Sequence, residues 1–447
     1  MNTAAPTLDE HRLINRLALR LMPLLGLLYL VAYIDRSNIS FAKLQMLDSL
    51  GLSEVAYGLG ASLFFVGYLL FEVPSNVLLH RYGAPRWMAR IMLTWGIVTV
   101  LLAFTRNAPM FYALRFLLGA SEAGLYPGVI YYLTLWFPAR HRTRMLGYFT
   151  VGSSLGNMIG APICGWLLDQ GGPGGLEGWR LVFIVTGVPS ILLTFVVLYC
   201  LPASPRSAAF LRDDEKTWLT RSLAAEAAQA DQAGDGAPAH GSPFRTLVEP
   251  RVLGFALYYM MLSISVYGVS YWLPTLVKGF GVSNTANGLL NVIPWLLATI
   301  VLATLPAKLR AGNHTISAML VSALLGMTFF VSSVFLPNNT LRFVALCLGA
   351  PCLYLLIPCF WTLPPKFLSG ARAAAGIAVI NSLGNIGGFI AQNLVPFVKQ
   401  ATGSARTPML IPAACLLLFA AFTAVVLSGR GRARSQRAGL DQVGASD

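Results

Sequence analysis

Two pairs of oppositely charged residues lie inside apolar stretches of this sequence. Asp35 and Arg36 are adjacent and follow an apolar run that begins at Leu13, whereas Arg115 and Glu122 are seven residues apart in a later run. A charge near the middle of a bilayer costs at least ~2.5–3.5 kcal/mol on insertion scales. Three interpretations of Asp35 and Arg36 are therefore open: they form a structural pair, mark the end of a span, or line a water-filled pathway. The remaining sequence is needed to choose among them.

The spacing of Arg115 and Glu122 places both on one face of a helix. Seven residues are two helical turns, or about 10 Å along the axis, which is one turn too far for direct contact. Each side chain therefore needs a partner from elsewhere, and Asp35 and Arg36 are the candidates. Two carboxylates and two guanidinium groups in a low-dielectric region form a coupled system, in which a carboxylate can exchange a proton when the pathway opens.

Composition identifies an integral membrane protein. The 447 residues are 56% hydrophobic and only 11% charged, whereas soluble domains contain about 25% charged residues. A soluble enzyme and a nucleic-acid-binding protein are both disfavoured, although the net charge is +14. The six cysteines lie in apolar runs without metal-ligand spacing, so we interpret them as small buried residues and expect no metal and no cofactor. No cleavable signal peptide is expected.

Twelve apolar runs have the length of a membrane span. They cover approximately residues 14–46, 55–79, 87–105, 109–137, 145–168, 180–201, 250–278, 285–307, 315–336, 340–364, 374–398 and 408–428. The first run is longer than a bilayer requires, so we expect it to be tilted, or broken near Asp35. The sequence thus predicts an all-α polytopic membrane protein with twelve transmembrane helices.

Internal repeats indicate that the helices form two pseudo-symmetric six-helix bundles. Gly51-Leu-Ser-x-x-Ala-x-Gly58 recurs as Gly281-Val-Ser-x-x-Ala-x-Gly288, and Ser154-Leu-Gly-Asn157 recurs as Ser382-Leu-Gly-Asn385. Parallel halves of this kind have a binding site at their interface near mid-membrane. The expected organisation is a cytoplasmic N-terminus, an N-terminal bundle, a cytoplasmic linker, a C-terminal bundle and a cytoplasmic tail, at 1–13, 14–202, 203–249, 250–428 and 429–447.

The distribution of Lys and Arg predicts that both termini are cytoplasmic. Most of these residues lie in loops on one side of the expected membrane, and that side is cytoplasmic by the positive-inside rule. Arg36 and Arg115 are the two that no loop can hold. In the linker, we expect Trp218, Leu219 and Leu223 to share a helix face that suits the membrane surface, and the basic cluster 430–437 suits anionic lipid headgroups.

Further motifs lie along almost the whole chain. They are Phe71-Glu-Val-Pro-Ser-Asn76-Val-Leu-Leu-His80-Arg81-Tyr-Gly83, Tyr271-Trp272-Leu-Pro274, Phe360-Trp361-x-Leu-Pro364 and Gly376-Ile-Ala-Val-Ile-Asn381-Ser-Leu-Gly-Asn385-Ile-Gly-Gly388. Together with Asp35-Arg36 and Arg115…Glu122, they resemble the anion:cation symporter family of the major facilitator superfamily. Within that family the chain is most similar to bacterial permeases for tartrate, phthalate-like and hydroxyphenylacetate-like acids.

The resemblance implies roles for particular residues. Asp35 and Glu122 match proton-binding carboxylates, Arg36 matches an arginine that pairs with the substrate carboxylate, and Arg115 matches one that links the site to Glu122. Positions that line the substrate cavity are matched by Tyr68, Trp361 and Asn381. Ser153 stands where some members carry a larger amide, and two tyrosines of the seventh span supply aromatic surface for substrate: Tyr267 and Tyr271.

The loop between the second and third spans departs from the superfamily pattern. That pattern is Gly-x-x-x-Asp-Arg-x-Gly, whereas this chain has His80-Arg81-Tyr82-Gly83-x-x-Arg86 and lacks the aspartate. We expect gating residues at Arg81 and Arg86, with Glu72 as a possible substitute for the missing acid.

These features favour a secondary active transporter over an enzyme. No GxxxxGK[ST] motif and no large soluble domain is found, so neither an enzyme nor an ATP-driven pump is expected. We expect a monomer of the bacterial inner membrane that imports a small organic anion, such as tartrate, a sugar acid or an aromatic acid, together with protons by alternating access. Its partners would be this anion, protons and membrane lipid, with no nucleic acid.

The alternative function is a drug/proton antiporter that exports small molecules. The fifth-span signature of such antiporters is Gly-x-x-x-Gly-Pro-x-x-Gly-Gly. This chain has a partial match, Gly156-x-x-x-Gly160-Ala-Pro162-x-x-Gly165, which has an extra Ala and lacks the second closing Gly. The two arginines in the apolar runs oppose the binding of cationic drugs.

Overall fold

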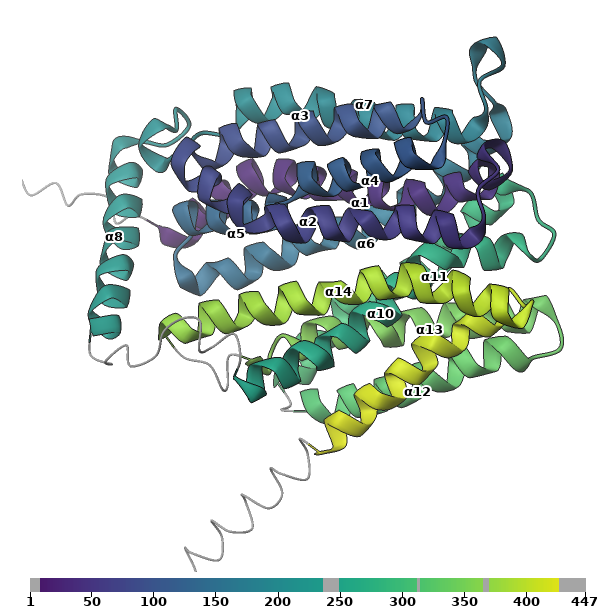
Figure 1. Ribbon diagram of the computed structural model, residues 1–447. Helices are drawn as coiled ribbons and strands as arrows, with labels where there is room; N and C mark the ends of the chain where they lie inside the picture. Colours follow the sequence, from purple (N-terminus) through teal and green to yellow (C-terminus); the bar gives the residue numbers. More distant parts are fainter. Residues whose placement is uncertain (1–8, 236–248, 312–313, 365–369, 426–447) are drawn as a thin grey trace, which may run out of the picture. The chain divides into compact units, whose positions relative to one another are not determined.

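The structure is a computed structural model that describes residues 9–235, 249–311, 314–364 and 370–425. The regular elements of these residues are helices (Figure 1). The chain divides into two compact units, of which the first holds residues 1–240 with 281–292 and the second holds residues 241–280 with 293–447.

Among its described residues, the first unit contains eight α-helices and the start of a ninth. Their bounds are α1 Glu10–Leu50, α2 Glu54–Tyr82, α3 Ala84–Leu102, α4 Ala108–Glu122, α5 Leu125–Trp136, α6 Ala139–Gln170, α7 Gly178–Cys200, α8 Asp213–Asp235 and α11 Asn284–Ala311. The start of α11 belongs here because Asp169, near the end of α6, accepts hydrogen bonds from Thr285 N, Thr285 Oγ1 and Asn284 Nδ2, each of 2.7 Å.

The second unit contains the remaining helices. They are α10 Pro250–Lys278, the rest of α11, α12 Thr315–Phe335, α13 Asn339–Phe360, α14 Gly370–Thr402 and a last apolar segment, Thr407–Val425. Within this unit α10 packs closely on α14, where a Cβ at Gly387 would stand 2.6 Å from the carbonyl oxygen of Met260.

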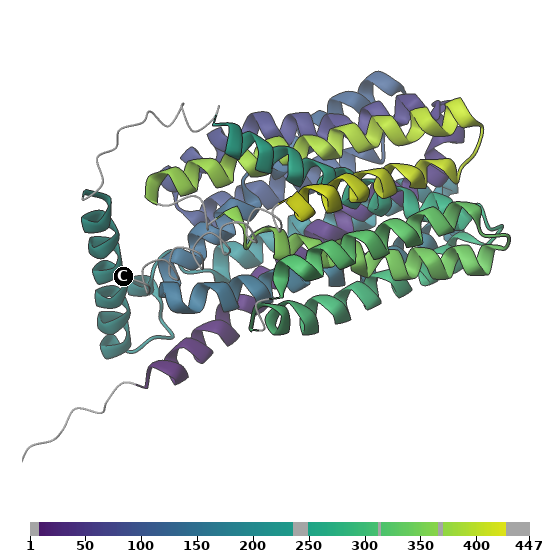
Figure 2. The ribbon, with the colours of Figure 1, turned by 90° about the horizontal axis from the view of Figure 1, so that it is seen from below.

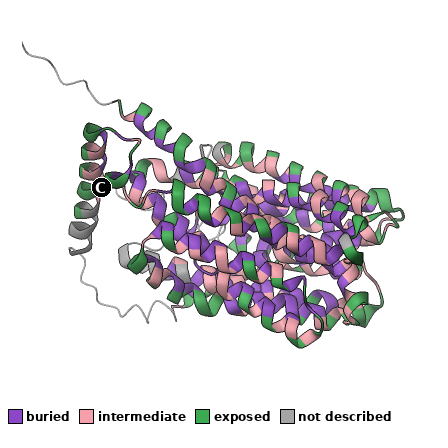
Figure 3. Ribbon diagram, turned by 90° about the horizontal axis from the view of Figure 1, so that it is seen from above, coloured by how far each residue is buried: buried purple, intermediate pink, exposed green. Residues whose placement is uncertain are grey.

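Nine helices of the described residues are long and apolar enough to cross a membrane. The other three expected spans also have helical counterparts: α3, the pair α4 and α5, and α14. Each long helix carries both buried and exposed residues (Figure 3). On α7 the exposed residues include Leu192 and Phe195, which are 60% and 63% exposed. An apolar side of this kind suits contact with lipid chains.

The first helix is continuous through the charged pair. Asp9 caps its start by accepting a hydrogen bond from Arg12 N, and Gly51 ends it with φ of 61°, a left-handed conformation that favours glycine. All 41 residues between these caps are helical. Of the two expectations for this long span, the break near Asp35 is therefore wrong.

The fourth expected span, 109–137, is two helices rather than one. α4 ends at Glu122 and α5 begins at Leu125, with Gly124 between them at φ of 93°. The cause is Pro127, which has no N–H and whose ring would clash with the carbonyl of Ala123 four residues earlier in a continuous helix. The freed carbonyl of Ala123 accepts a hydrogen bond of 2.6 Å from Ser75 Oγ. The break leaves Glu122 as the last residue of α4.

The first sequence repeat corresponds to a repeated local structure. Gly51 and Gly281 both have positive φ, of 61° and 82°. Two residues later, Ser53 and Ser283 each accept a 3.1 Å hydrogen bond from the backbone N–H three positions on, at Ala56 and Ala286. Each copy of the motif is thus a turn followed by a serine N-cap, which starts α2 in one case and α11 in the other.

Glycines allow the helices that carry the charged pairs to approach closely. Gly152, Gly156 and Gly160 follow one another at intervals of four along α6, where any Cβ would stand within 2.8 Å of an atom of α1. On α4, a Cβ at Gly119 would stand 1.9 Å from the carbonyl oxygen of Phe64 in α2. Small residues at such contacts permit close packing of membrane helices. The glycines therefore hold α1 against α6, and α2 against α4.

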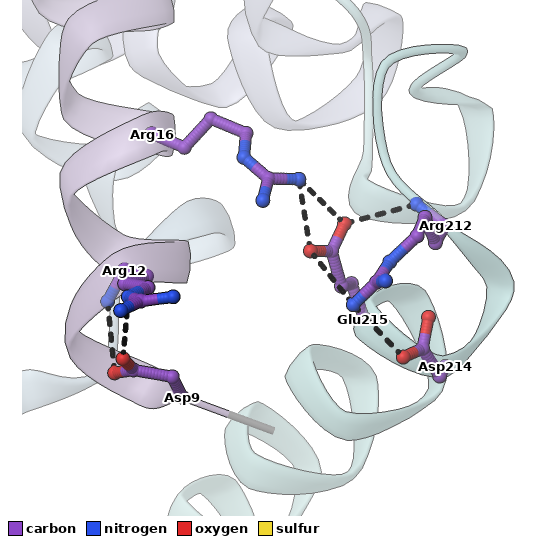
Figure 4. A network of polar contacts seen from close by, with 6 residues as sticks. All are labelled: Asp9, Arg12, Arg16, Arg212, Asp214 and Glu215. Atoms are coloured by element: carbon purple, nitrogen blue, oxygen red, sulfur yellow. Dashed lines mark hydrogen bonds and ion pairs between the residues drawn. The ribbon is translucent and has the colours of Figure 1, made fainter. Parts of the chain in front are cut away.

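α8 lies crosswise at one end of the long helices of the first unit (Figures 1 and 2). Glu215, whose side chain is 3% exposed, accepts hydrogen bonds of 2.9 and 3.2 Å from Arg16 Nη1 and one of 3.0 Å from Arg212 N (Figure 4). Leu219, one turn further, is fully buried. The expected linker helix is thus fixed to the start of α1.

Candidate functional site

The contact between Arg36 and Glu122 is the centre of the site. Arg36 donates Nε to Oε1 of Glu122 at 2.8 Å and also donates Nη2 to the same oxygen. The Glu122 side chain is 1% exposed and that of Arg36 is 18% exposed. An ion pair this deeply buried between α1 and α4 is stable only with both members present, because removing one leaves an uncompensated charge. Of the two candidate partners named from the sequence, Arg36 is therefore the one that forms an ion pair with Glu122.

Arg115 lies beside this pair but bonds differently. Its Nη2 donates to the carbonyl oxygen of Ala61 at 3.2 Å, and its guanidinium carbon lies 5.1 Å from the centre of the Phe64 ring. Arg36 lies 5.9 Å from the same ring. Phe64 therefore contacts both guanidinium groups, and cation–π attraction contributes to holding them.

Two buried polar atoms of this cluster make no hydrogen bond among the described residues. They are Oε2 of Glu122 and Nε of Arg115. Buried polar atoms in folded proteins are normally paired, so unpaired ones call for an explanation such as a ligand, a proton or water. With Glu122 ionised, the three charged side chains carry a net charge of one positive, and protonation of Glu122 raises it to two. The cluster is suited to a small anion.

Asp35 lies in a different network from the arginines. Its Oδ2 accepts hydrogen bonds from Trp95 Nε1 at 2.5 Å and from Thr99 Oγ1 at 3.1 Å, both on α3. Its Oδ1 accepts one of 2.8 Å from Asn38 Nδ2. Asp35, one of the two candidate partners for Arg115, thus makes its hydrogen bonds to other residues. Consecutive residues of a helix project about 100° apart, so Arg36 faces α4 while Asp35 faces α3.

Two further expected site residues of the first unit are half-buried. Tyr68 lies one turn beyond Phe64 on α2, with ring centres 6.0 Å apart. Ser153 lies on α6 and donates its hydroxyl to the carbonyl oxygen of Thr150 at 2.7 Å, so only its acceptor capacity remains for a ligand.

The expected gating residues lie on α2 and at the start of α3. Glu72 is buried on α2, 8% exposed. Arg81 and Arg86 are exposed on either side of the turn at Gly83, and Arg81 lies over the Tyr82 ring at 5.8 Å.

Four expected site residues belong to the second unit. Tyr271 is 7% exposed and its ring centre lies 6.1 Å from that of Tyr267, one turn away on α10. Trp361 follows the end of α13, with its ring centre 4.9 Å from that of Tyr259. Asn381 is half-buried on α14. Their part in a binding site stays a prediction.

Several residues around the charged pairs escaped the sequence reasoning. The guanidinium carbon of Arg36 lies over the Tyr33 ring, 5.2 Å from the ring centre. The Tyr33 hydroxyl is 3.4 Å from that of Tyr29. The signal was available, because Tyr33 precedes Arg36 by three residues and shares its helix face. Trp95 and Thr99 are likewise four apart on α3, but nothing in the local sequence points to Asp35 as their partner. Among the described residues, no group of three or more His, Cys, Asp or Glu could hold a metal ion.

Comparisons with known proteins identify relatives of this chain. The sequence profile of the Major Facilitator Superfamily matches residues 25–392. A putative tartrate transporter of Agrobacterium vitis is 39% identical over 421 residues, which are 93% of this chain and 95% of the relative. A putative metabolite transport protein, NicT, of Pseudomonas putida is 39% identical over 411 residues, 91% of this chain and 92% of the relative.

A third relative has a different name. The quinolone resistance transporter of Acinetobacter baumannii is 38% identical over 434 residues, 97% of this chain and 99% of the relative. Among solved structures, the inward open xylose transporter XylE from Escherichia coli shares the fold with a TM-score of 0.71, at 15% identity, over 91% of this chain and 95% of XylE. These findings confirm the predicted fold class.

Proposed function

Since this chain belongs to the major facilitator superfamily of membrane transporters, we propose that it is a proton-coupled symporter of a small organic anion with at least one carboxylate. The names of the tartrate transporter and metabolite transporter relatives support solute transport of this class.

One observation carries the proposal: the buried pair of Arg36 and Glu122 with Arg115 beside it. A guanidinium group binds a carboxylate with two parallel hydrogen bonds, and such charge-assisted bonds are among the strongest in proteins. In the described state Arg36 uses two donors on Glu122. A substrate carboxylate can take the place of Glu122 on Arg36 if the charge of Glu122 is removed.

Protonation of Glu122 is the step that couples proton binding to substrate binding. A protonated acid holds a guanidinium less tightly than an ionised one, so the proton releases Arg36 for the anion. By linkage, a proton that strengthens anion binding is itself bound more tightly when the anion is present. Departure of the substrate restores the Arg36–Glu122 pair and expels the proton. The aromatic ring of Phe64 keeps both arginines in place during the exchange.

The test is uptake by purified protein in proteoliposomes. We expect radiolabelled tartrate or benzoate to accumulate when the outside is acidified, and accumulation to stop when a protonophore collapses the gradient. Liposomes without protein measure leakage of the protonated acids. Uptake that ignores the collapsed gradient but follows sodium would remove protons from the mechanism, and a failure of every tested carboxylate would remove the substrate class.

The relative named for quinolone resistance supports a second candidate, an exporter that exchanges drugs for protons. Quinolones are themselves carboxylic acids, so the arginines do not exclude them. The same liposomes distinguish the two functions by direction. A symporter moves the acid into the compartment that protons enter, whereas an antiporter moves the drug out of it.

A further inference from the structure

Asp35 accepts hydrogen bonds from donors on two helices, α1 and α3. Trp95 and Thr99 of α3 donate to Oδ2, and Asn38 of α1 donates to Oδ1. Asn38 also donates to Thr186 Oγ1 of α7 at 2.9 Å. Each member is at most 3% exposed. The network therefore lies in the packed interior of the first unit rather than on an open surface.

The close approach of α3 and α7 builds this enclosure. A Cβ at Gly96 would stand 3.0 Å from the carbonyl oxygen of Gly187, and a Cβ at Gly187 would stand 3.0 Å from that of Gly96. Gly96 follows Trp95, and Gly187 follows Thr186. The two glycines thus bring the donors of α3, and the Thr186 hydroxyl of α7 that accepts from Asn38, to the side of α1 where Asp35 projects.

The donors suit the ionised form of the carboxylate. The indole of tryptophan can only donate, so Oδ2 must accept from Trp95. Three hydrogen bonds to a carboxylate favour its ionised form, whereas burial without a paired cation favours the neutral form. The ionisable groups that act on Asp35 through space are Glu122 and Arg115 of α4 and Cys164 of α6, while α3 and α7 present Trp95, Thr99 and Thr186. The charge state of Asp35 thus depends on these neutral donors.

We propose that Trp95 and Thr99 are positioning residues for Asp35, which the family resemblance already gives as a proton-binding carboxylate: their hydrogen bonds set the pH at which Asp35 takes up its proton. This inference rests on the proposed function, because it assigns a proton to that transport cycle. Protonation of Asp35 affects substrate binding through α1. When ionised, Asp35 holds α1 against α3 by hydrogen bonds, and the neighbouring residue, Arg36, binds Glu122 or the anion. Protonation weakens the tie to α3 and frees α1 to move.

The first experiment measures the protonation of Asp35 without any substrate. Infrared difference spectroscopy of the purified protein follows the band of a protonated carboxyl group during a pH titration, and Asp35→Asn identifies the band by removing it. We expect Trp95→Phe and Thr99→Val each to move the midpoint of this band about one pH unit upward, because each removes a donor to the ionised form. Thr99→Ser keeps the hydroxyl and should restore the parent midpoint.

Two matched variants serve as controls. Trp136→Phe makes the same substitution at a fully buried indole whose Nε1 bonds to nothing among the described residues. Thr194→Val removes a buried hydroxyl that donates only within its own helix, to the carbonyl oxygen of Ser190 at 3.2 Å. Neither should move the midpoint. If Trp95→Phe behaves like Trp136→Phe, or if Trp95→Phe moves a band that survives in Asp35→Asn, the positioning role is wrong.

The second experiment follows transport. The pH profile of substrate counterflow in proteoliposomes should move upward with Trp95→Phe by the same amount as the infrared midpoint. In the Asp35→Asn background, Trp95→Phe should leave the profile unchanged. A normal infrared shift with no uptake of any carboxylate would reject the proposed substrate class and keep the proton site. Uptake with an unshifted infrared midpoint would do the reverse.

Discussion

Arg36 donates Nε and Nη2 to one oxygen of Glu122, and the other oxygen of Glu122 makes no hydrogen bond among the described residues. Only one of the two carboxylate oxygens of Glu122 therefore takes part in the pair. A guanidinium bound in this way can transfer its two donors to another carboxylate without first breaking a full bidentate pair.

Replacing Arg36 with lysine should abolish two-point binding of a carboxylate. An ammonium group keeps the charge but cannot present two donors in the plane of a carboxylate. We expect affinity for the transported acid to fall at least about tenfold, which corresponds to ~1.4 kcal/mol. Substrate-induced protection against thermal unfolding measures it. The control is Arg16→Lys, which alters an arginine–glutamate pair elsewhere on α1 and should leave affinity unchanged. Unchanged affinity in Arg36→Lys would exclude Arg36 from the site.

Glu122→Gln should separate substrate exchange from accumulation. Glutamine resembles the protonated acid and cannot release a proton, so Arg36 stays available for the anion. We expect counterflow to persist while accumulation driven by a proton gradient is lost. Both assays use the same liposomes, and Glu215→Gln, in the α8 contact, is the matched control that should retain both activities. Accumulation at the parental level in Glu122→Gln would make Glu122 a structural acid.

Gly119→Ala tests the packing of α2 against α4. The new Cβ would stand 1.9 Å from the carbonyl oxygen of Phe64, which is backbone and cannot rotate away. Overpacking of this kind costs about 1–3 kcal/mol, and the separation of the helices would also displace Phe64 from both arginines. We expect a lower unfolding temperature in detergent together with weaker substrate binding.

Gly147→Ala is the control for this prediction. Gly147 is also inside a helix, α6, but among the described residues nothing outside its own turn of helix lies within 4 Å of its added Cβ. Alanine is preferred to glycine inside a helix by roughly 0.5–1 kcal/mol, so this variant should be as stable as the parent or more stable. Equal behaviour of the two variants would mean that the α2–α4 contact is looser than described.

Glu215→Ala should release α8 from the start of α1. The substitution removes the hydrogen bonds from Arg16 and from the backbone of Arg212, and each bond to a charged group is worth about 1.5–3 kcal/mol at most. Because half of the Arg16 side chain is exposed, water can solvate it and the net loss should be about 1 kcal/mol. Faster hydrogen exchange in 213–235 measures it. Asp214→Asn, at an exposed pair with Arg212, should exchange like the parent.

Glu177, in the loop before α7, should stabilise the protein only above acidic pH. Partial burial raises the pKa of this carboxyl, but hydrogen bonds from Ser49, Arg180 and Trp179 outweigh it and hold the pKa below the usual 4.5. A lowered pKa in the folded state gives stability that is present above 4.5 and is lost as pH falls through the folded value. Glu177→Gln should therefore lower the thermal midpoint at neutral pH and lose this difference in acid.

The effect of Glu177 should be small, below about 1 kcal/mol, because 44% of its side chain is exposed and water screens the ion pair with Arg180. Ser49→Ala removes one of the three donors and should show a smaller change of the same sign. An equal difference between Glu177→Gln and the parent at neutral and acidic pH would contradict the assignment.

The sequence by itself determined the class of protein and singled out the charged residues inside its apolar runs. Long apolar runs can satisfy their backbone groups in a bilayer only as helices, so composition and length were enough to predict the spans. Charges inside such runs are costly, and this singled out Asp35, Arg36, Arg115 and Glu122 without any structure. The break after Glu122 was also encoded locally by Pro127, although the apolar run concealed it.

The tertiary structure decided which of these charges meet. Asp35 and Arg36 are neighbours in sequence, yet one bonds to Trp95, 60 residues away, and the other to Glu122, 86 residues away. Apolarity and helical period say which residues are buried, but they do not say which helices pack together. That choice depends on the close glycine contacts of α1 with α6, α2 with α4 and α3 with α7, because only at those separations can side chains from distant helices reach each other.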